Sequence, residues 1–318
     1  MRTTFLPLLS RLSVVVLLLI SWGCQKQDDV VATPQTITDR IVEDGQFSLL
    51  RVAIAQAGVS DVFKDGNLTL FAPTDSAFQA AGLGTIAAIR SVPPEQMRTL
   101  VLYHLLTGSV MASDIPAGMN SVETLNKGIL YINKATNGTI YVNNARLTQA
   151  DIRTANGYIH TVNRVLMPSI GNVLTTIQNN PNLTFLTAAI KRIGTSNPTL
   201  LATLENASSA NKVTIFAPND AAFKADKVYN TLNAIESASV QTLTNILLYH
   251  VIAGARFSTQ FKTESLDTFY TGNKLITIIT PTQLMVKGAK NLTAATVRQV
   301  DIPATNGVIH IIDQVLQP

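Results

Sequence analysis

Histidine is the residue type in this chain with the most obvious capacity for chemistry, and each histidine falls in a repeated motif. The chain has four histidines. A Leu-Tyr-His motif ends at His104 and again at His250, and an Asn-Gly-x-Ile-His motif ends at His160 and again at His310. Imidazole can bind a metal or move a proton, but a metal site needs convergent ligands, and no His-x-x-x-His or Cys/His spacing occurs. We therefore expect no metal and no cofactor, and we interpret the histidines as structural.

Other catalytic patterns are equally sparse. Asp75 and Asp220 are candidate acids, but each stands where a carboxylate or its neighbour would cap a short helix. The sequence has no Gly-x-Ser-x-Gly elbow and no phosphate-binding Gly-Lys-Ser/Thr loop. The one cysteine, Cys24, lies close to the N-terminus. These observations predict a protein that is not an enzyme.

The chain is one unit written twice. The segment Thr-Leu-Phe-Ala-Pro-Thr-Asp-Ser-Ala-Phe at 69–78 returns as Thr-Ile-Phe-Ala-Pro-Asn-Asp-Ala-Ala-Phe at 214–223. A repeat of about 145 residues is a complete domain and is too long for a solenoid unit. We therefore predict domains at 36–168 and 169–318. The extra residues of the second repeat fall in 195–211, which is rich in Ser, Asn and Thr and which we predict to be a surface loop.

Hydrophobic periodicity predicts helices first and strands second in each repeat. Gly58 is a predicted helix end, and Pro94 a predicted helix start. The helix from Pro94 is expected to carry His104 on its apolar stripe and to continue to Gly108. Asn-Gly pairs at 137–138, 156–157 and 306–307 predict hairpins with positive φ at both turn residues. The remaining predicted elements in the first repeat are helices at 36–44, 47–57 and up to 78, and strands at 68–71, 129–132, 139–142 and 158–165. The predicted fold class is α+β with a mainly antiparallel sheet.

The N-terminus has the character of an export signal. A short apolar run ends just before Gly23-Cys24, and it is too short to cross a bilayer as a helix. It resembles a bacterial lipoprotein signal, which implies a signal peptide at 1–23, lipid attachment at Cys24 and a tether at 24–35. A plain secretory signal is the alternative. The chain has 24 basic and 20 acidic residues without a basic run, so we expect no nucleic-acid partner.

The repeated blocks together resemble the fasciclin (FAS1) family. They are Phe-Ala-Pro-x-Asp-x-Ala-Phe, the Tyr-His pair and Asn-Gly-x-Ile-His, in that order and twice. The resemblance implies a wedge of β-sheet with packed helices, and an adhesion protein without catalytic activity. With the polar, acidic stretch after Cys24, it implies a Bacteroidetes-type surface lipoprotein. Such a protein would be anchored to the outer membrane by lipid alone and would bind an extracellular matrix-like protein or a polysaccharide.

The resemblance also implies ligand-contact residues, because animal matrix members of the family use Asp-Ile and Tyr-His segments to recognise integrins. Carried onto this chain, these are Asp151, Ile152, Asp301, Ile302, Tyr103, His104, Tyr249 and His250. The structural alternative is that these residues only form the fold. Two further functions remain open: a carbohydrate-binding accessory of glycan uptake, using loop tyrosines such as Tyr131 or Tyr270, and a structural lipoprotein of the envelope. The loops 109–127, 195–211 and 257–264 are further candidate contacts.

Overall fold

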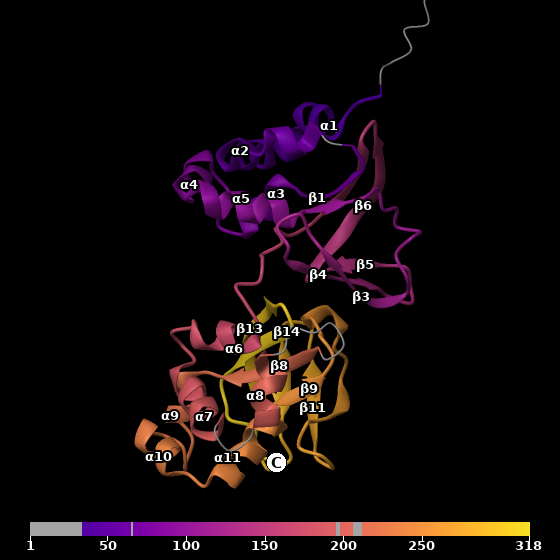
Figure 1. Ribbon diagram of the computed structural model, residues 1–318. Helices are drawn as coiled ribbons and strands as arrows, with labels where there is room; N and C mark the ends of the chain where they lie inside the picture. The colour runs from indigo at the N-terminus through magenta and orange to yellow at the C-terminus, as the bar shows by residue number, and fades with distance from the viewer. Residues whose placement is uncertain (1–33, 65, 195–197, 206–211) are drawn as a thin grey trace, which may run out of the picture. The chain divides into compact units, whose positions relative to one another are not determined.

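The computed structural model describes residues 34–64, 66–194, 198–205 and 212–318 (Figure 1). Residues 34–318 belong to one compact unit, and within it two domains of the same topology follow one another along the chain. The predicted signal peptide at 1–23, Cys24 and residues 24–33 of the tether predicted at 24–35 lie outside the described residues.

Helices form the first half of the first domain. Thr36 caps α1 by accepting from the backbone of Asp39, whose carboxylate binds back to the Thr36 N–H. Gly58 ends α2 in the left-handed conformation at φ 61°. The helices are α1 (Ile37–Glu43), η1 (Gly45–Phe47), α2 (Ser48–Ala57), η2 (Ser60–Lys64), α3 (Asp75–Ala80), α4 (Ile86–Ser91) and α5 (Pro94–Tyr103).

The sheet of the first domain has the order β2-β1-β7-β6-β5-β4-β3. All its pairs are antiparallel except β1 with β7. Every residue of β1 is buried, because Leu70 points into a core shared with the helices and Phe71 into a second core on the other face. The strands are β1 (Leu68–Pro73), β2 (Leu105–Thr107), β3 (Gly118–Glu123), β4 (Ile129–Lys134), β5 (Ile140–Val142), β6 (Ala145–Thr154) and β7 (Gly157–Val162).

The second domain repeats this plan, with the sheet order β10-β11-β12-β13-β14-β8-β9. Its parallel pair is β8 with β14. The helices are α6 (Val173–Gln178), α7 (Thr184–Gly194), α8 (Pro198–Glu205), α9 (Asp220–Lys224), α10 (Leu232–Ser237), α11 (Val240–Tyr249) and η3 (Ser258–Gln260). The strands are β8 (Val213–Pro218), β9 (Val251–Ala253), β10 (Glu264–Asp267), β11 (Lys274–Ile279), β12 (Leu284–Lys287), β13 (Ala295–Ala304) and β14 (Gly307–Ile312).

Two sequence predictions about these elements are wrong. The helix from Pro94 ends at Tyr103, not at Gly108, because the His104 carbonyl accepts from Phe71 N and the chain then continues as β2 beside β1. The predicted surface loop at 195–211 contains α8, in which Leu200 and Leu204 are 3% and 2% exposed. Both leucines pack in the helix-side core of their domain, so part of the insertion belongs to the fold.

The predicted hairpins at 156–157 and 306–307 exist, but their turns lie one residue earlier. Gly157 is the first residue of β7, and a Cβ there would lie 1.8 Å from the Leu68 carbonyl oxygen. Asn156 is a turn residue without positive φ. Its side chain accepts from Ile37 N at 2.8 Å and donates to the Phe63 carbonyl at 2.7 Å. The asparagine therefore ties the N-terminal helices to the sheet.

The second domain repeats this tie. Asn306 accepts from Val173 N at 2.7 Å and donates to the Leu204 carbonyl at 3.0 Å. The third predicted hairpin, at Asn137-Gly138, joins β4 to β5, but only Gly138 has a positive φ.

Candidate functional site

The Tyr-His histidines are core residues of their domains. His104 is 2% exposed; its Nδ1–H donates to the Leu100 carbonyl at 2.8 Å, and its Nε2 accepts from Leu166 N at 2.9 Å. His250 makes the same bonds, at 2.7 Å to the Ile246 carbonyl and 2.9 Å from Leu316 N. Burial lowers the pKa of both histidines to about 4, so at neutral pH each ring is uncharged. Each ring joins the end of a helix to the irregular segment near the end of its domain.

The neighbouring tyrosines are equally deep. The Tyr103 hydroxyl donates to the Ile129 carbonyl at 2.7 Å and accepts from Asn143 Nδ2 at 3.1 Å. The Tyr249 hydroxyl donates to the Lys274 carbonyl at 2.6 Å and accepts from Ala289 N at 2.9 Å. Burial raises the pKa of both phenols.

Burial rules out the Tyr-His pairs as surface contacts. Tyr103 and Tyr249 are 0% exposed, and His104 and His250 are 2% exposed. Side chains at this depth cannot touch a ligand at the surface of the folded domain. The sequence prediction of ligand contact is therefore wrong for these four residues, which hold the helices to the sheet.

The Asp-Ile pairs lie at a β-bulge in each domain. Asp151 has φ 57° and Asp301 has φ 64°, in the left-handed region that few residues other than glycine adopt. The pairing of β6 with β7 shifts register between Gln149 and Ile152, and β13 with β14 shifts at the corresponding place. Each bulge therefore needs partners that hold its strained residue in place.

A histidine from the facing strand holds each bulge. The Asp151 N–H donates to His160 Nδ1 at 3.1 Å, and the opposite ring nitrogen donates to the Val110 carbonyl at 2.9 Å. His310 does the same for Asp301, at 3.2 Å, and donates to the Arg256 carbonyl at 2.8 Å. Burial lowers the pKa of both histidines. Each of these histidines links its bulge to the loop after an edge strand, which is β2 in the first domain and β9 in the second. The sequence did not predict this role.

The two aspartates differ in what their carboxylates are free to do. Both oxygens of Asp301 accept from Ser258, one from its backbone N–H and one from its hydroxyl, each at 2.5 Å, and the residue is 7% exposed. Asp151 accepts from Ala112 N at 2.8 Å, and its side chain remains 40% exposed. Ile152 and Ile302 are half-buried against the helix-side cores. Among the predicted contacts, Asp151 is therefore the one with an accessible charged group.

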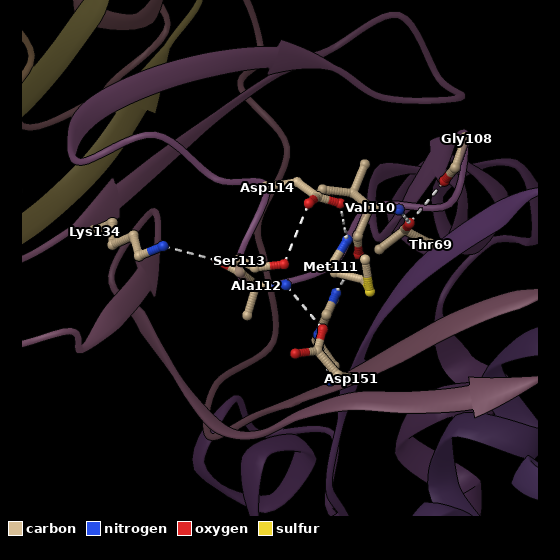
Figure 2. A network of polar contacts seen from close by, with 10 residues as sticks. Thr69, Gly108, Val110, Met111, Ala112, Ser113, Asp114, Lys134 and Asp151 are labelled. Carbon is tan, nitrogen blue, oxygen red and sulfur yellow. Dashed lines mark hydrogen bonds and ion pairs between the residues drawn. The ribbon is translucent and has the colours of Figure 1, made fainter.

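Figure 2 shows how the loop 108–115 is fastened around Asp151. The Thr69 hydroxyl donates to the Gly108 carbonyl at 2.7 Å and accepts from the loop backbone at Val110 at 2.9 Å. Lys134 Nζ donates to the Ala112 carbonyl at 3.0 Å. The loop is thus held from β1, β4 and β6 together, so the Asp151 carboxylate lies on an ordered surface.

A hollow of about 470 Å³ opens beside this network, where Ala112 and Ala150 form part of its lining. Its polar lining comes from Asn137, Thr139, Arg146 and Thr148. A second hollow of about 530 Å³ lies over α2, lined by Leu49, Val52, Ala55 and Ile86 together with arginines. Both volumes fall in the range of small-ligand sites, but the first is polar and lies next to Asp151.

Within the described ranges, no cluster of three or more His, Cys, Asp or Glu side chains could hold a metal ion. In the same part of the chain, no helix combines the length and apolar character needed to cross a bilayer.

The repeated α+β domain defines the chain as a tandem-domain protein built on one fold. The fasciclin domain model matches residues 45–168 and 181–318, and the chain belongs to the fasciclin domain family. The sequence-based recognition of tandem FAS1 domains and the predicted α+β fold class are thereby confirmed.

Several relatives are proteins of animals and bacteria. The chain is 26% identical over 254 residues to the transforming growth factor-beta-induced protein ig-h3 of Sus scrofa, and 27% identical over 254 residues to periostin of Homo sapiens. Each alignment covers 80% of this chain but only 35% and 28% of those proteins. An uncharacterized protein of Synechocystis is 32% identical over 133 residues, which are 41% of this chain and 96% of that protein.

A solved structure is also similar, a FAS1 domain pair from the insect cell adhesion molecule Fasciclin I. It has 19% sequence identity and a TM-score of 0.40, and the match covers 85% of this chain and 96% of that one.

Proposed function

We propose that this chain is a non-enzymatic adhesion protein that presents two fasciclin domains to an extracellular ligand from a lipid anchor at Cys24. Family membership supports the adhesive role. The observation that carries the site is the exposed carboxylate of Asp151, which lies at the bulge of β6 beside a loop that three strands hold in place. Two tethered domains raise the effective concentration of a second contact, which strengthens binding that is weak in each domain.

The first domain is the better candidate for ligand contact through Asp-Ile. A carboxylate that already accepts two bonds from Ser258 would lose them to bind a ligand, whereas Asp151 accepts one bond and keeps its other oxygen for a partner. Ile152 contributes a half-buried apolar side chain next to it. The Asp301-Ile302 segment serves the fold of the second domain in this proposal.

The test is a binding panel with the full chain against matrix proteins, polysaccharides and whole cells. Asp151→Ala is expected to weaken saturable binding, while Asp267→Ala, which removes an exposed carboxylate in the second domain that pairs with Lys274, is expected to leave it unchanged. Equal binding by both variants and the parent protein would remove Asp151 from the site. Absence of binding to every member of the panel would favour a structural role in the envelope.

The anchor and its orientation have their own experiment. Cys24→Ser is expected to abolish incorporation of labelled fatty acid and to release the chain from membranes. Protease added to intact cells is expected to degrade the anchored protein if it faces outward. Survival of the protein in intact cells, with degradation after lysis, would place it inside the envelope and contradict surface presentation.

A second candidate function is carbohydrate binding, and the polar hollow beside Asp151 favours it. The tyrosines predicted for this role fit poorly: Tyr131 lies in β4 and is 1% exposed, while Tyr270 is half-buried against the second core of its domain. A carbohydrate site would therefore need another aromatic residue.

A further inference from the structure

The register of β4, β5 and β6 places three side chains of useful chemistry in one row. Tyr141 is directly opposite Asn133 on β4 and directly opposite Arg146 on β6. Side chains that face each other across antiparallel strands lie on the same side of the sheet, with their Cβ atoms about 5 Å apart. An aromatic ring therefore lies between an amide and a guanidinium group.

The row is on the face of the sheet opposite its apolar core. Next to Tyr141, Ile140 and Val142 are 7% and 0% exposed, so alternation along β5 turns Tyr141 outward. On β6, Ala145 is buried and Arg146 is exposed. Asn133 and Tyr141 are half-buried.

The second domain has the same row with different chemistry. Ile278, Met285 and Thr296 are opposite one another in the same order on β11, β12 and β13. All three are half-buried. The shared fold therefore does not require a tyrosine, an amide or an arginine at these positions.

The polar surroundings of Arg146 also differ from those of Thr296, the residue at the same position of the second domain. There, Asp313 accepts from Thr296 N at 2.7 Å and forms an ion pair with Arg298 at 2.7 Å. In the first domain the matching acceptor is Asn163, which accepts from Arg146 N at 2.7 Å and carries no charge. Within the described part of the chain, no carboxylate forms an ion pair with the Arg146 guanidinium.

The polar hollow adjoins this row, because Arg146 itself forms part of its lining. Asn137 and Thr139 on the β4–β5 hairpin and Thr148 on β6 supply amide and hydroxyl groups around a volume of about 470 Å³. Two further lining residues, Ala112 and Ala150, lie beside Asp151: Ala112 N donates to the Asp151 carboxylate, and Ala150 precedes Asp151 in the chain. Donors and acceptors thus surround a space that begins at the end of the row.

We infer that the first domain binds a polysaccharide across the outer face of β4, β5 and β6, with Tyr141 as the platform. The ring packs against the C–H face of a sugar, as aromatic side chains present an apolar body with a polar tip. Asn133 and Arg146 bind sugar hydroxyls, and Arg146 also suits the carboxylate of a uronic sugar. The hollow holds the neighbouring sugar residue. This inference rests on the proposed binding function and names the ligand class and the site.

The experiment is affinity electrophoresis of the full chain in gels containing polygalacturonate or dextran, an acidic and a neutral polymer. Tyr141→Ala and Arg146→Gln are each expected to weaken binding by at least about tenfold, as for central residues of a binding surface. Met285→Ala and Thr296→Ala, at the same positions of the second domain, are the matched controls and are expected to bind as the parent does. Unchanged thermal unfolding of each variant shows that the fold is intact.

Retardation by either polymer that is lost in both first-domain variants supports the inference. Absence of retardation in both gels, or equal loss in the second-domain controls, overturns it. The outcome is separable from the proposed function, because a chain that binds matrix proteins or cells through Asp151 but neither polymer would keep the adhesive role and lose the glycan site.

Discussion

Acidification is expected to destabilise both domains through His104 and His250. The Nε2 atom of each ring accepts a backbone N–H, so protonation of that nitrogen breaks a buried hydrogen bond. Burial lowers the folded-state pKa from 6.5 to about 4 in each case. The unfolded chain therefore binds protons first as the pH falls. The stabilisation is fully present above pH 6.5 and is lost progressively as the pH falls toward 4.

The magnitude follows from the difference in protonation. At pH 5 a histidine in the unfolded chain is mostly charged while the folded ring is mostly neutral, which lowers the free energy of unfolding by about 2 kcal/mol per histidine. The pKa values of His160 and His310 are lowered as well and add in the same direction. Ordinary carboxylates titrate mainly below pH 5, so this window isolates the histidines. A loss of this size is a large fraction of the stability of a typical domain.

The measurement is urea unfolding followed by circular dichroism at pH 7.5 and pH 5.0. The parent protein is expected to unfold at a lower urea concentration at pH 5.0. His104→Gln is expected to be less stable at pH 7.5 and to lose about 2 kcal/mol less on acidification, because one titrating group is gone. Equal midpoints at the two pH values, or an undiminished loss in the variant, would refute the assignment of His104 as a buried neutral ring.

Three further substitutions test the packing and the polar contacts. Gly157→Ala is expected to lower the free energy of unfolding by more than about 4 kcal/mol, because the new Cβ would overlap the Leu68 carbonyl oxygen. Gly138→Ala, in open space at φ 83°, is expected to lower it by about 1 kcal/mol. Similar losses in thermal unfolding of the two variants would contradict the close approach of β1 and β7. Tyr103→Phe leaves Asn143 without its hydroxyl acceptor and is expected to cost about 1–3 kcal/mol in urea unfolding; a neutral change would exclude the bond. Asp301→Ala is expected to lower the free energy of unfolding by about 2 kcal/mol, because its loss leaves two Ser258 donors unpaired in a buried position. Asp151→Ala is expected to lower it by less than about 1 kcal/mol. The reverse order in thermal denaturation would show that the exposure of the two aspartates is misassigned.

Much of the fold could be predicted because local chemistry agrees with it. Gly58 ends α2 in the left-handed conformation, and Pro94 begins α5, as their positions indicate. The end of α5 could not be read from periodicity, since Leu105 continues the apolar stripe. The helix stops because β1 offers backbone partners to the next residues. Tertiary hydrogen bonding overrides helix propensity there. In α8 the opposite happens: a helix forms where a polar sequence context predicted a loop, because its leucines pack into the core.

The candidate site was harder to predict, because the relevant information is cross-strand. Asp151 and His160 lie at nearly equal distances from the turn at Ala155–Asn156, so a hairpin register would have paired them, but the bulge that lets the N–H reach the ring is not visible in the residue order. The exposure of Asp151 and the burial of Asp301 could not be distinguished either, since the motifs read alike. The difference comes from Ser258, the first residue of η3, which is far from Asp301 in the sequence.

The comparison of the two domains separates residues that the fold requires from residues that it leaves free. Both domains keep the histidine that holds the bulge and the asparagine that ties helix to sheet, because each satisfies backbone groups that would otherwise be buried without a partner. No such requirement applies to the outer row of the sheet. Met285 and Thr296 of the second domain occupy the positions that Tyr141 and Arg146 occupy in the first. Positions that the fold leaves free are where two copies of one domain can acquire different ligands, and the outer face of the first domain is therefore the place where binding chemistry should be sought.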